Sequence, residues 1–306
     1  PSSGGADRGN PSRRVHSERP PIVYAAPNQI PTPEEQIKDN EYTYLDEHQR
    51  FGVNLILTRF AKKARGFFLA DGPGVGKTAI LLAVAHVMSK KGKVLIVTQS
   101  KDIINDSFKD DAIGLGIDPK KSGITITTYN DIKTLDEGGN MKFSNTEFVL
   151  VIYDESHKLK NSHTGNAIAS FNIKSDHILF SSATPMDKPT GAVYFMSQIL
   201  GLSEEDIYNR LGLQVSTYRD KDGVSKKKVT LLKGTSPQQV AKRLQGLALT
   251  AIREGAMLRR EFPFWGTIEE VALIPDNIAE ILAEEAEIKS YWEGRPRTAG
   301  QMLNEL

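Results

Sequence analysis

The amino-acid sequence predicts an α/β fold, with a parallel sheet covered by helices on both faces and a mainly helical extension after it. Short apolar runs alternate with segments of helical periodicity along much of the chain. Strands that are apolar throughout are typical of a parallel sheet buried on both faces. A glycine-rich turn follows the first apolar run, and two adjacent acids follow a later one. Such sheets bind ligands at the carboxyl ends of their strands.

The strands of the predicted sheet are short runs of aliphatic, aromatic and β-branched residues. Turn-forming residues bound each run, and this pattern is typical of a buried strand. A later segment, 267–274, alternates like an edge strand. The expected strands of the sheet are 66–70, 94–97, 124–129, 148–153 and 177–181.

Helices are expected between and after these strands, where apolar residues recur every three or four positions. Ser236 and Pro237 offer an N-cap residue and a proline at the first helical position. A polar segment over 219–233 contains Asp222 and Gly223, a pair typical of a hairpin turn. The helical segments are 45–60, 78–88, 107–115, 190–200, 236–256, 276–291 and one that starts at 203.

Three parts are expected along the chain. Residues 1–41 are rich in Pro, Ser, Gly and Arg and cannot bury enough apolar surface to offset their ordering entropy, which predicts a disordered arm or linker. Within this arm, 20–24 could dock as an extended segment. Residues 42–202 form the α/β lobe, and residues 203–306 form the mainly helical extension. Because the chain begins with proline and stops within a helical pattern, we expect an excerpt of a longer protein.

Composition excludes several classes of protein. Of the 306 residues, 39% are hydrophobic, and no apolar run approaches the ~18–20 residues that span a bilayer. The absence of cysteine excludes disulfides, thiolate metal sites and cysteine nucleophiles. The N-terminus has no secretory signal pattern. The net charge of +1 does not by itself indicate a nucleic-acid partner. We expect no membrane partner and an intracellular location: cytoplasm or nucleoid if the source is a bacterium or phage, nucleus if it is a eukaryote.

The glycine-rich turn after 66–70 has the residues that a nucleoside triphosphate needs. Glycines let backbone N–H groups approach phosphate oxygens, and the dipole of the following helix favours negative charge. Lys77, a catalytic as well as a binding residue, would reach the β- and γ-phosphates, and Thr78 would place its hydroxyl on Mg²⁺. Asp71 stands where the general pattern has glycine or alanine. The residues expected to bind ATP are Gly72, Pro73, Gly74, Val75, Gly76, Lys77 and Thr78.

Two adjacent acids follow the apolar run 148–153. Asp154 would hold Mg²⁺ at the sheet edge, and Glu155 would orient and deprotonate the attacking water, so both are expected to be catalytic. The alternative is a pair of surface acids that cap a loop. His157 is expected to link the nucleotide to the rest of the protein. We do not expect it to be a metal ligand, because no second histidine or cysteine lies at ligand spacing.

These motifs resemble those of the superfamily 2 helicases and translocases, whose nucleotide-binding lobe has a RecA-like fold. The run 69–78, with its Asp71, resembles the first nucleotide motif of chromatin-remodelling translocases and, more closely, that of strawberry notch proteins. Residues 154–161 resemble motif II, and 182–185 resemble motif III, which couples hydrolysis to movement. The resemblance covers roughly residues 42–290 and implies an ATP hydrolase. It assigns coupling roles to His157, Ser182 and Thr184.

The same resemblance implies contacts with adenine and with nucleic acid. Residues 45–49 resemble the glutamine motif, which makes Gln49 the adenine candidate. Residues 97–100 resemble motif Ia and 127–129 resemble motif Ib, and both motifs contact the nucleic-acid backbone. DNA is favoured over RNA as the partner. The implied nucleic-acid residues are Gln99, Ser100, Thr127 and Thr128.

A second RecA-like lobe is implied as a further partner, because in this superfamily it carries the arginine finger. Residues 257–262 and 264–266 resemble the segment that precedes that lobe. An arginine finger raises the rate ~10³–10⁵-fold, so the first lobe alone is expected to bind ATP but to hydrolyse it slowly. Two interpretations stay open for Arg259 and Arg260. They either clamp the nucleotide or the second lobe, or they are helix-end charges that face solvent.

Two other functions are compatible with the sequence. One is a nucleotide-dependent switch that does not translocate, and the other is a scaffold that binds ATP structurally. Lys226, Lys227 and Lys228 form a basic cluster. This cluster is either a solvated face or a contact with duplex phosphates, and the second use would weaken steeply with salt.

Overall fold

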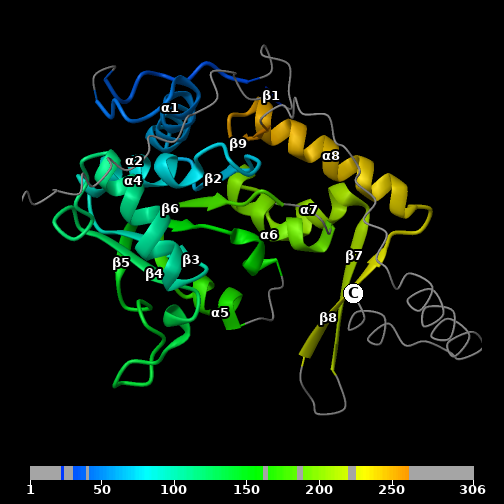
Figure 1. Ribbon diagram of the computed structural model, residues 1–306. Coiled ribbons are helices and arrows are strands. Elements are labelled where there is room, and N and C mark those ends of the chain that lie inside the picture. Colours follow the sequence, from blue (N-terminus) through cyan, green and yellow to red (C-terminus); the bar gives the residue numbers. More distant parts are fainter. Residues whose placement is uncertain are drawn as a thin grey trace, which may run out of the picture. The chain divides into compact units, whose positions relative to one another are not determined.

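A parallel sheet of six strands forms the centre of the fold (Figure 1). The strands are β2 Gly66–Leu69, β3 Val94–Thr98, β4 Ile124–Thr128, β5 Glu147–Tyr153, β6 Lys174–Ser181 and β9 Met257–Leu258. Their order across the sheet is β4-β3-β5-β6-β2-β9, and all neighbouring pairs run parallel. The predicted α/β class with a parallel sheet is confirmed.

The computed structural model describes residues 22–23, 30–38, 41–160, 165–184, 189–219 and 225–261. All of them belong to one unit of the chain, residues 1–263, and a second unit begins at Phe264. Several predictions therefore lie outside the described residues. These are the hairpin turn at Asp222 and Gly223, the motif at 264–266, the edge strand at 267–274 and the helix at 276–291.

Helices cover both faces of the sheet. They are α1 Glu47–Ala61, α2 Lys77–Ser89, α3 Lys101–Ile103, α4 Lys109–Gly114, α5 Gly165–Phe171, α6 Pro189–Leu200, α7 Glu204–Leu211 and α8 Pro237–Arg253. Successive strand residues point to opposite faces, and Phe67 and Phe68 of β2 accordingly belong to two different hydrophobic clusters. Helices α1, α2 and α4 contribute to the cluster around Phe67, and α5 to α8 contribute to the cluster around Phe68.

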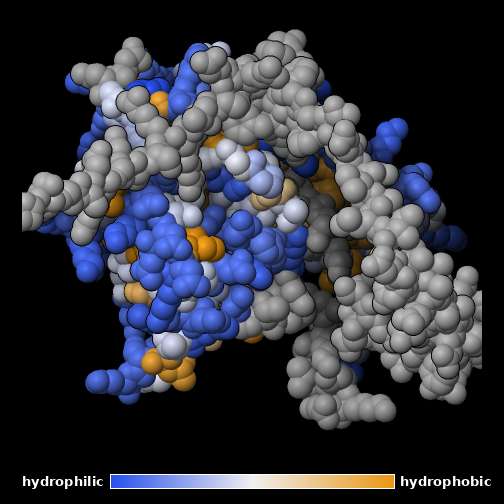
Figure 2. Space-filling view, in the orientation of Figure 1, coloured by the Kyte–Doolittle hydropathy of each residue, from blue (hydrophilic) through white to orange (hydrophobic). Residues whose placement is uncertain are grey.

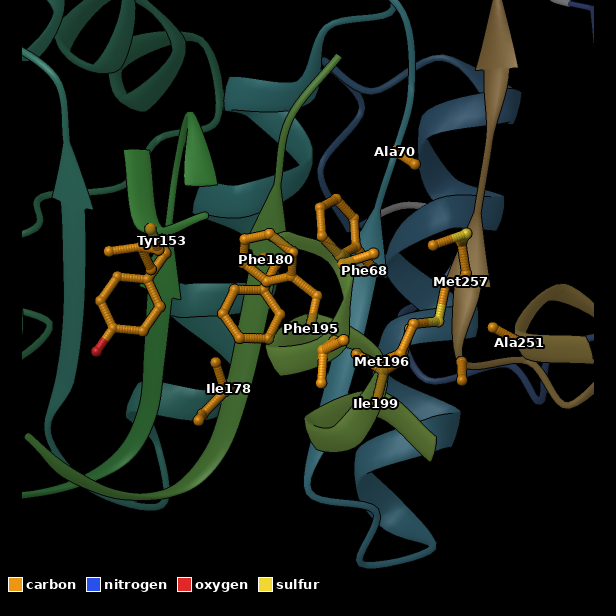
Figure 3. Packing of buried hydrophobic residues seen from close by; sticks show 14 of the residues in the cluster. Phe68, Ala70, Tyr153, Ile178, Phe180, Phe195, Met196, Ile199, Ala251 and Met257 are labelled. Atoms are coloured by element: carbon orange, nitrogen blue, oxygen red, sulfur yellow. The ribbon is translucent and has the colours of Figure 1, made fainter. Parts of the chain in front are cut away.

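Aromatic rings fix α6 against the two strands that lead to the candidate site (Figure 3). The ring centroids of Phe68 and Phe195 lie 5.3 Å apart, and those of Phe180 and Phe195 lie 5.0 Å apart. Both pairs are edge-on, an arrangement that contributes ~0.5–1.5 kcal/mol beyond the buried area. Because Phe68 lies on β2 and Phe180 on β6, this packing positions the carboxyl ends of both strands.

Strand β9 comes from the region that the sequence places in the extension. It pairs in parallel with β2, and the N–H of Phe68 donates to the carbonyl of Ala256 at 2.9 Å. Ile252 and Ala251 of α8 are buried in the same hydrophobic cluster as Phe68. The sheet of the lobe therefore extends past residue 202. Its last strand is only two residues long, too short for a periodic pattern to reveal.

Part of the predicted arm is ordered on α1. The N–H of Glu34 donates to Thr58 Oγ1 at 3.0 Å, and the N–H of Ile37 donates to Asn54 Oδ1 at 3.1 Å. Ile37 is buried. Residues 30–38 thus differ from the predicted disorder, because α1 offers polar partners for their backbone. The two residues of β1, Ile22–Val23, pair antiparallel with β10, Arg260–Glu261, so this part of 20–24 docks as an extended strand as the sequence suggests.

A two-stranded ribbon occupies the segment where the sequence predicts a hairpin. It consists of β7 Leu213–Arg219 and β8 Ser225–Leu231, which pair antiparallel. Leu213 at the start of β7 is buried, whereas the residues from Ser216 onward along the strand are exposed.

Hydrophilic residues dominate the coloured surface of the face drawn in Figure 2. Within the described ranges, none of the helices has the length and apolar character needed to cross a membrane.

Short helical segments and turns follow strands β3, β4 and β5. The predicted helix 107–115 is the second half of a helical run that begins with α3, passes through a π-helical turn, Ile104–Phe108, and ends with α4. Short 3₁₀ turns, Asp131–Lys133 and Ser156–Leu159, follow β4 and β5. Both turns lie at the carboxyl edge of the sheet, where the candidate site is.

Candidate active site

The predicted phosphate loop connects β2 to α2. Gly74 and Gly76 have φ of +81° and +75°, in the left-handed region that glycine adopts without steric cost. A Cβ on Gly76 would also clash with the side-chain amide of Gln49, which would have to move away from the loop to admit it. The loop ends at Lys77, the first residue of α2. Its backbone N–H groups therefore lead into a helix N-terminus, a structure suited to phosphate.

The side chain of Lys77 lies over this loop. Its ammonium donates to the carbonyl oxygens of Asp71 at 3.2 Å and Gly72 at 3.0 Å. Burial raises the pKa of Asp154, and the positive charge of Lys77 acts against that rise, so the two predicted catalytic groups lie within electrostatic reach of each other. Thr78 follows Lys77 in the first turn of α2 and is partly exposed.

Asp154 is the first residue after β5, and groups from the two neighbouring strands hold its carboxylate. Thr98 Oγ1, at the end of β3, donates to Oδ2 at 2.9 Å. Ser181 Oγ, at the end of β6, donates to Oδ1 at 3.4 Å. Burial raises the pKa of Asp154, while the hydrogen bond from Thr98 opposes that rise. The carboxylate is therefore fixed in orientation at the edge where the sequence predicts a Mg²⁺ ligand.

Glu155 has an unusual backbone conformation. Its φ of +49° and ψ of 46° lie in the left-handed region, which costs a non-glycine residue ~1–2 kcal/mol. Its side chain is about one third exposed, and Oε2 lies 3.1 Å from His157 Nδ1. Backbone strain of this kind clusters at functional sites. The outlier coincides with the residue that the sequence predicts to activate water.

The three predicted coupling residues lie together. His157 Nδ1, next to Glu155, also lies 3.4 Å from Ser182 Oγ. The N–H of Thr184 donates to the same Ser182 oxygen at 3.2 Å. The N–H of Ser182 donates to the carbonyl of Leu69 at 3.1 Å, at the end of β2. A chain of contacts thus connects Glu155 to the strand that begins the phosphate loop.

Gln49 lies beneath the phosphate loop and is buried. Its Oε1 accepts from the N–H of Asp46 at 2.9 Å, and its Nε2 donates to the carbonyl of Val75 at 3.4 Å. The amide therefore caps α1 and supports the loop. Its predicted role toward adenine remains a prediction. The loop support could not be found from the sequence, because it depends on how α1 packs against the loop.

Asp71 forms a buried ion pair that sequence reasoning missed. Arg260 Nε donates to Asp71 Oδ1 at 3.1 Å and to Oδ2 at 3.2 Å. Arg260 is 2% exposed and Asp71 is 0% exposed. Neither open interpretation of Arg260 describes this arrangement. The missed signal was Asp71 itself, because a carboxylate directly after a buried strand needs a cation.

The four predicted nucleic-acid residues lie at the ends of β3 and β4. Three of their hydroxyls serve local turns: Thr128 Oγ1 accepts from the N–H of Asp131 at 3.2 Å, Thr127 Oγ1 donates to Asp131 Oδ2 at 3.4 Å, and Ser100 Oγ accepts from the N–H of Ile103 at 3.4 Å. Gln99 is exposed. Their contact with nucleic acid stays a prediction.

The predicted Mg²⁺ ligands fit a site completed by the nucleotide. In the part of the chain that the structure describes, no three His, Asp or Glu residues cluster closely enough to form a metal site by themselves. Mg²⁺ in nucleotide sites is usually held by one or two protein groups together with water and substrate phosphates. One fixed carboxylate, Asp154, and one hydroxyl at a helix start, Thr78, match that requirement.

Comparisons with known proteins show what the chain is similar to. Residues 43–187 match the family described as "Type III restriction enzyme, res subunit". The chain is 30% identical over 173 residues to the human DNA excision repair protein ERCC-6-like, a match that covers 47% of this chain and 13% of that protein. It is 27% identical over 169 residues to the ATP-dependent helicase FUN30 of Saccharomyces cerevisiae, covering 46% of this chain and 14% of that protein. The chain thus spans only about one seventh of the length of these relatives.

A solved structure shares the fold. The Sulfolobus solfataricus SWI2/SNF2 ATPase core in complex with dsDNA aligns with a TM-score of 0.51 and 18% identity, covering 89% of this chain and 58% of that chain. The lobe therefore has the RecA-like α/β fold. Parts of the chain are thus similar to a restriction-enzyme family, to an ATP-dependent helicase and to the core of an ATPase.

Proposed function

We propose that this chain is the ATP-binding lobe of a nucleic-acid-dependent ATPase, which hydrolyses ATP with Mg²⁺ to move along or remodel nucleic acid. One observation supports this proposal above the others. Glu155 is held in a left-handed conformation, next to Asp154, on the sheet edge that also bears the phosphate loop. Tyr42, Lys63 and Phe143 also have positive φ, so the strain at Glu155 supports the proposal through its place beside Asp154 and the phosphate loop.

The roles of the residues follow from their positions. Backbone N–H groups of 72–76 and the Lys77 ammonium would bind the triphosphate. Thr78 and Asp154 would hold Mg²⁺, which neutralises charge on the transferring phosphoryl group. Glu155 would orient the attacking water and accept its proton. His157 and Ser182 would connect that carboxylate to the end of β2, so that a change at the phosphates reaches the rest of the lobe.

DNA is the proposed polymer, and a second RecA-like lobe is the proposed partner within the full-length protein. Two relatives are named for DNA repair and for helicase action, and the solved structure holds dsDNA. A second lobe would supply an arginine finger, worth ~10³–10⁵ in rate. We therefore expect slow hydrolysis by this chain alone. The finer resemblance to strawberry notch proteins, carried by Asp71 and the surrounding loop, and an intracellular location belong to the same proposal.

Replacing Glu155 with glutamine tests the proposal. Glu155→Gln keeps the size of the side chain but removes the proton acceptor. We expect the variant to bind ATP with wild-type affinity and to lose turnover ~10²–10⁴-fold. Equilibrium binding of a fluorescent ATP analogue and phosphate release, with and without duplex DNA, measure the two effects. Glu147→Gln is the matched control, because Glu147 is exposed at the opposite end of β5.

The alternatives give different outcomes in the same assay. A scaffold that binds ATP structurally would show no change in phosphate release on Glu155→Gln. In the full-length protein, which has the proposed second lobe, a switch that does not translocate would lose turnover, but its wild-type rate would not respond to DNA. Failure of the wild-type chain to bind ATP would overturn the proposal itself.

A further inference from the structure

A backbone ladder joins the phosphate loop to the end of the described chain. The N–H of Ala70 donates to the carbonyl of Leu258 at 2.7 Å, as expected for β2 and β9. The ladder then continues beyond both strands, because the N–H of Gly72 donates to the carbonyl of Arg260, also at 2.7 Å. The first glycine of the phosphate loop is thus hydrogen-bonded to a residue that lies far along the chain.

The side chain of Arg260 adds a second connection to the same place. Its guanidinium contacts both carboxylate oxygens of Asp71, the residue before that glycine. It also donates to the carbonyl oxygen of His48 in α1. Gly52, one turn further along α1, leaves space for the guanidinium: a Cβ there would lie 3.0 Å from Arg260 Nη2. Arg260 therefore connects α1 to the first residues of the loop.

The positive charge of Arg260 lies close to the loop that is proposed to bind the triphosphate. Burial raises the pKa of the Asp71 carboxyl, and the Arg260 guanidinium opposes that rise by stabilising the carboxylate. The carbonyl of Asp71 also accepts from Lys77, the residue expected to contact the phosphates. Without Arg260, the start of the loop would hold either a buried anion without its cation or a neutral acid in a changed position.

We propose that Arg260 is a positioning residue of the nucleotide site, which sets the shape of the phosphate loop through Asp71 and the N–H of Gly72. This proposal rests on the proposed function. It also explains why Asp71 stands where the general pattern has glycine or alanine: the carboxylate is the attachment point for a side chain 189 residues away. ATP affinity then depends on the segment that follows α8.

The test compares Arg260 with a second arginine that ties the same region together. Arg59 donates to the carbonyls of Glu254 at 3.1 Å and Ile199 at 2.8 Å, and both of these partners lie outside the phosphate loop. Arg260→Gln, Arg260→Lys and Arg59→Gln are made in the full chain. Binding of a fluorescent ATP analogue is measured well below each variant's unfolding midpoint, so that only folded protein is titrated.

We expect Arg260→Gln to weaken ATP binding ~10- to 100-fold, as displacement of a supporting group does at other sites. Arg260→Lys should fall between this variant and the wild type, because it keeps the charge but not the paired hydrogen bonds. Arg59→Gln should lower the unfolding midpoint and leave ATP affinity within twofold of the wild type.

Wild-type ATP affinity in Arg260→Gln would overturn the proposal and leave Arg260 a structural residue only. If Arg260→Gln does not fold, Arg260→Lys decides, and wild-type affinity in that variant would overturn it equally. A wild-type chain that binds no ATP is a different result, because it removes the proposed function while the ion pair remains.

Discussion

Two ends of one sheet edge are held in different ways. At the nucleotide end, contacts come from segments distant in sequence: Arg260 reaches Asp71 across 189 residues, and Thr98 reaches Asp154 across 56. Among the predicted nucleic-acid residues, Ser100 and Thr128 each serve a turn only three residues away. The nucleotide end is therefore preorganised by the whole lobe, whereas the predicted nucleic-acid end is organised mainly by its own turns. A site for chemistry needs the first arrangement, and a surface that tracks a polymer can use the second.

The largest effect is expected at Glu155, where one substitution should lower turnover and raise the stability of the fold. Glu155→Gly should reduce turnover ~10²–10⁴-fold, because the proton acceptor is lost. The same change should raise the free energy of unfolding by up to ~1 kcal/mol, because glycine adopts φ of +49° freely and this gain exceeds its added unfolded-state entropy. Phosphate release and urea unfolding measure the two effects. Glu155→Ala loses the same contact with His157 but keeps a Cβ, so a Glu155→Gly variant less stable than Glu155→Ala would show that the backbone of Glu155 is not strained.

A smaller effect is expected where a neighbouring strand supports the acid. Thr98→Val removes the donor to Asp154 Oδ2 with little change in shape. We expect Mg²⁺-dependent ATP binding to weaken ~10- to 100-fold, the usual range for a group that orients a metal ligand. Titration of the ATP analogue at several Mg²⁺ concentrations measures it. The control is Thr125→Val, an exposed threonine on β4. Equal affinities in both variants would contradict the support role.

The smallest effect is expected at the locally organised end. Gln99 is exposed, so Gln99→Ala should leave the unfolding midpoint unchanged. If this edge contacts nucleic acid, the affinity for duplex DNA should fall roughly 2- to 10-fold, the range of one hydrogen bond. Fluorescence anisotropy with labelled duplex DNA, and then duplex RNA, measures the change. Lys228→Ala on the exposed part of β8 is titrated in parallel. A loss only in the second variant would move the interface to the ribbon.

Local patterns predicted most of the fold and the positions of the glycine-rich loop and the adjacent acids within it. Strands of four or more apolar residues, the glycine turn and the adjacent acids all depend on near neighbours, and the structure has them where they were expected. Strand β9 was not predicted, because two residues carry no period. The Asp71–Arg260 pair was missed for a related reason: its two residues are 189 positions apart, and only the fold brings them together. Nor could any pattern reveal the φ of Glu155.

Because β9 and Arg260 lie far along the sequence from β2, the sheet is completed late during synthesis on the ribosome. Arg260 follows Asp71 by 189 residues, so at ordinary elongation rates it emerges roughly 10–40 s after the strand it completes. During that interval β2 is an open sheet edge, and Asp71 lacks its cation. A nascent lobe therefore lacks this support for its phosphate loop until Arg260 has been made. An expression fragment that stops before residue 256 would have the same defect permanently, and boundaries for producing this lobe should lie beyond Arg260.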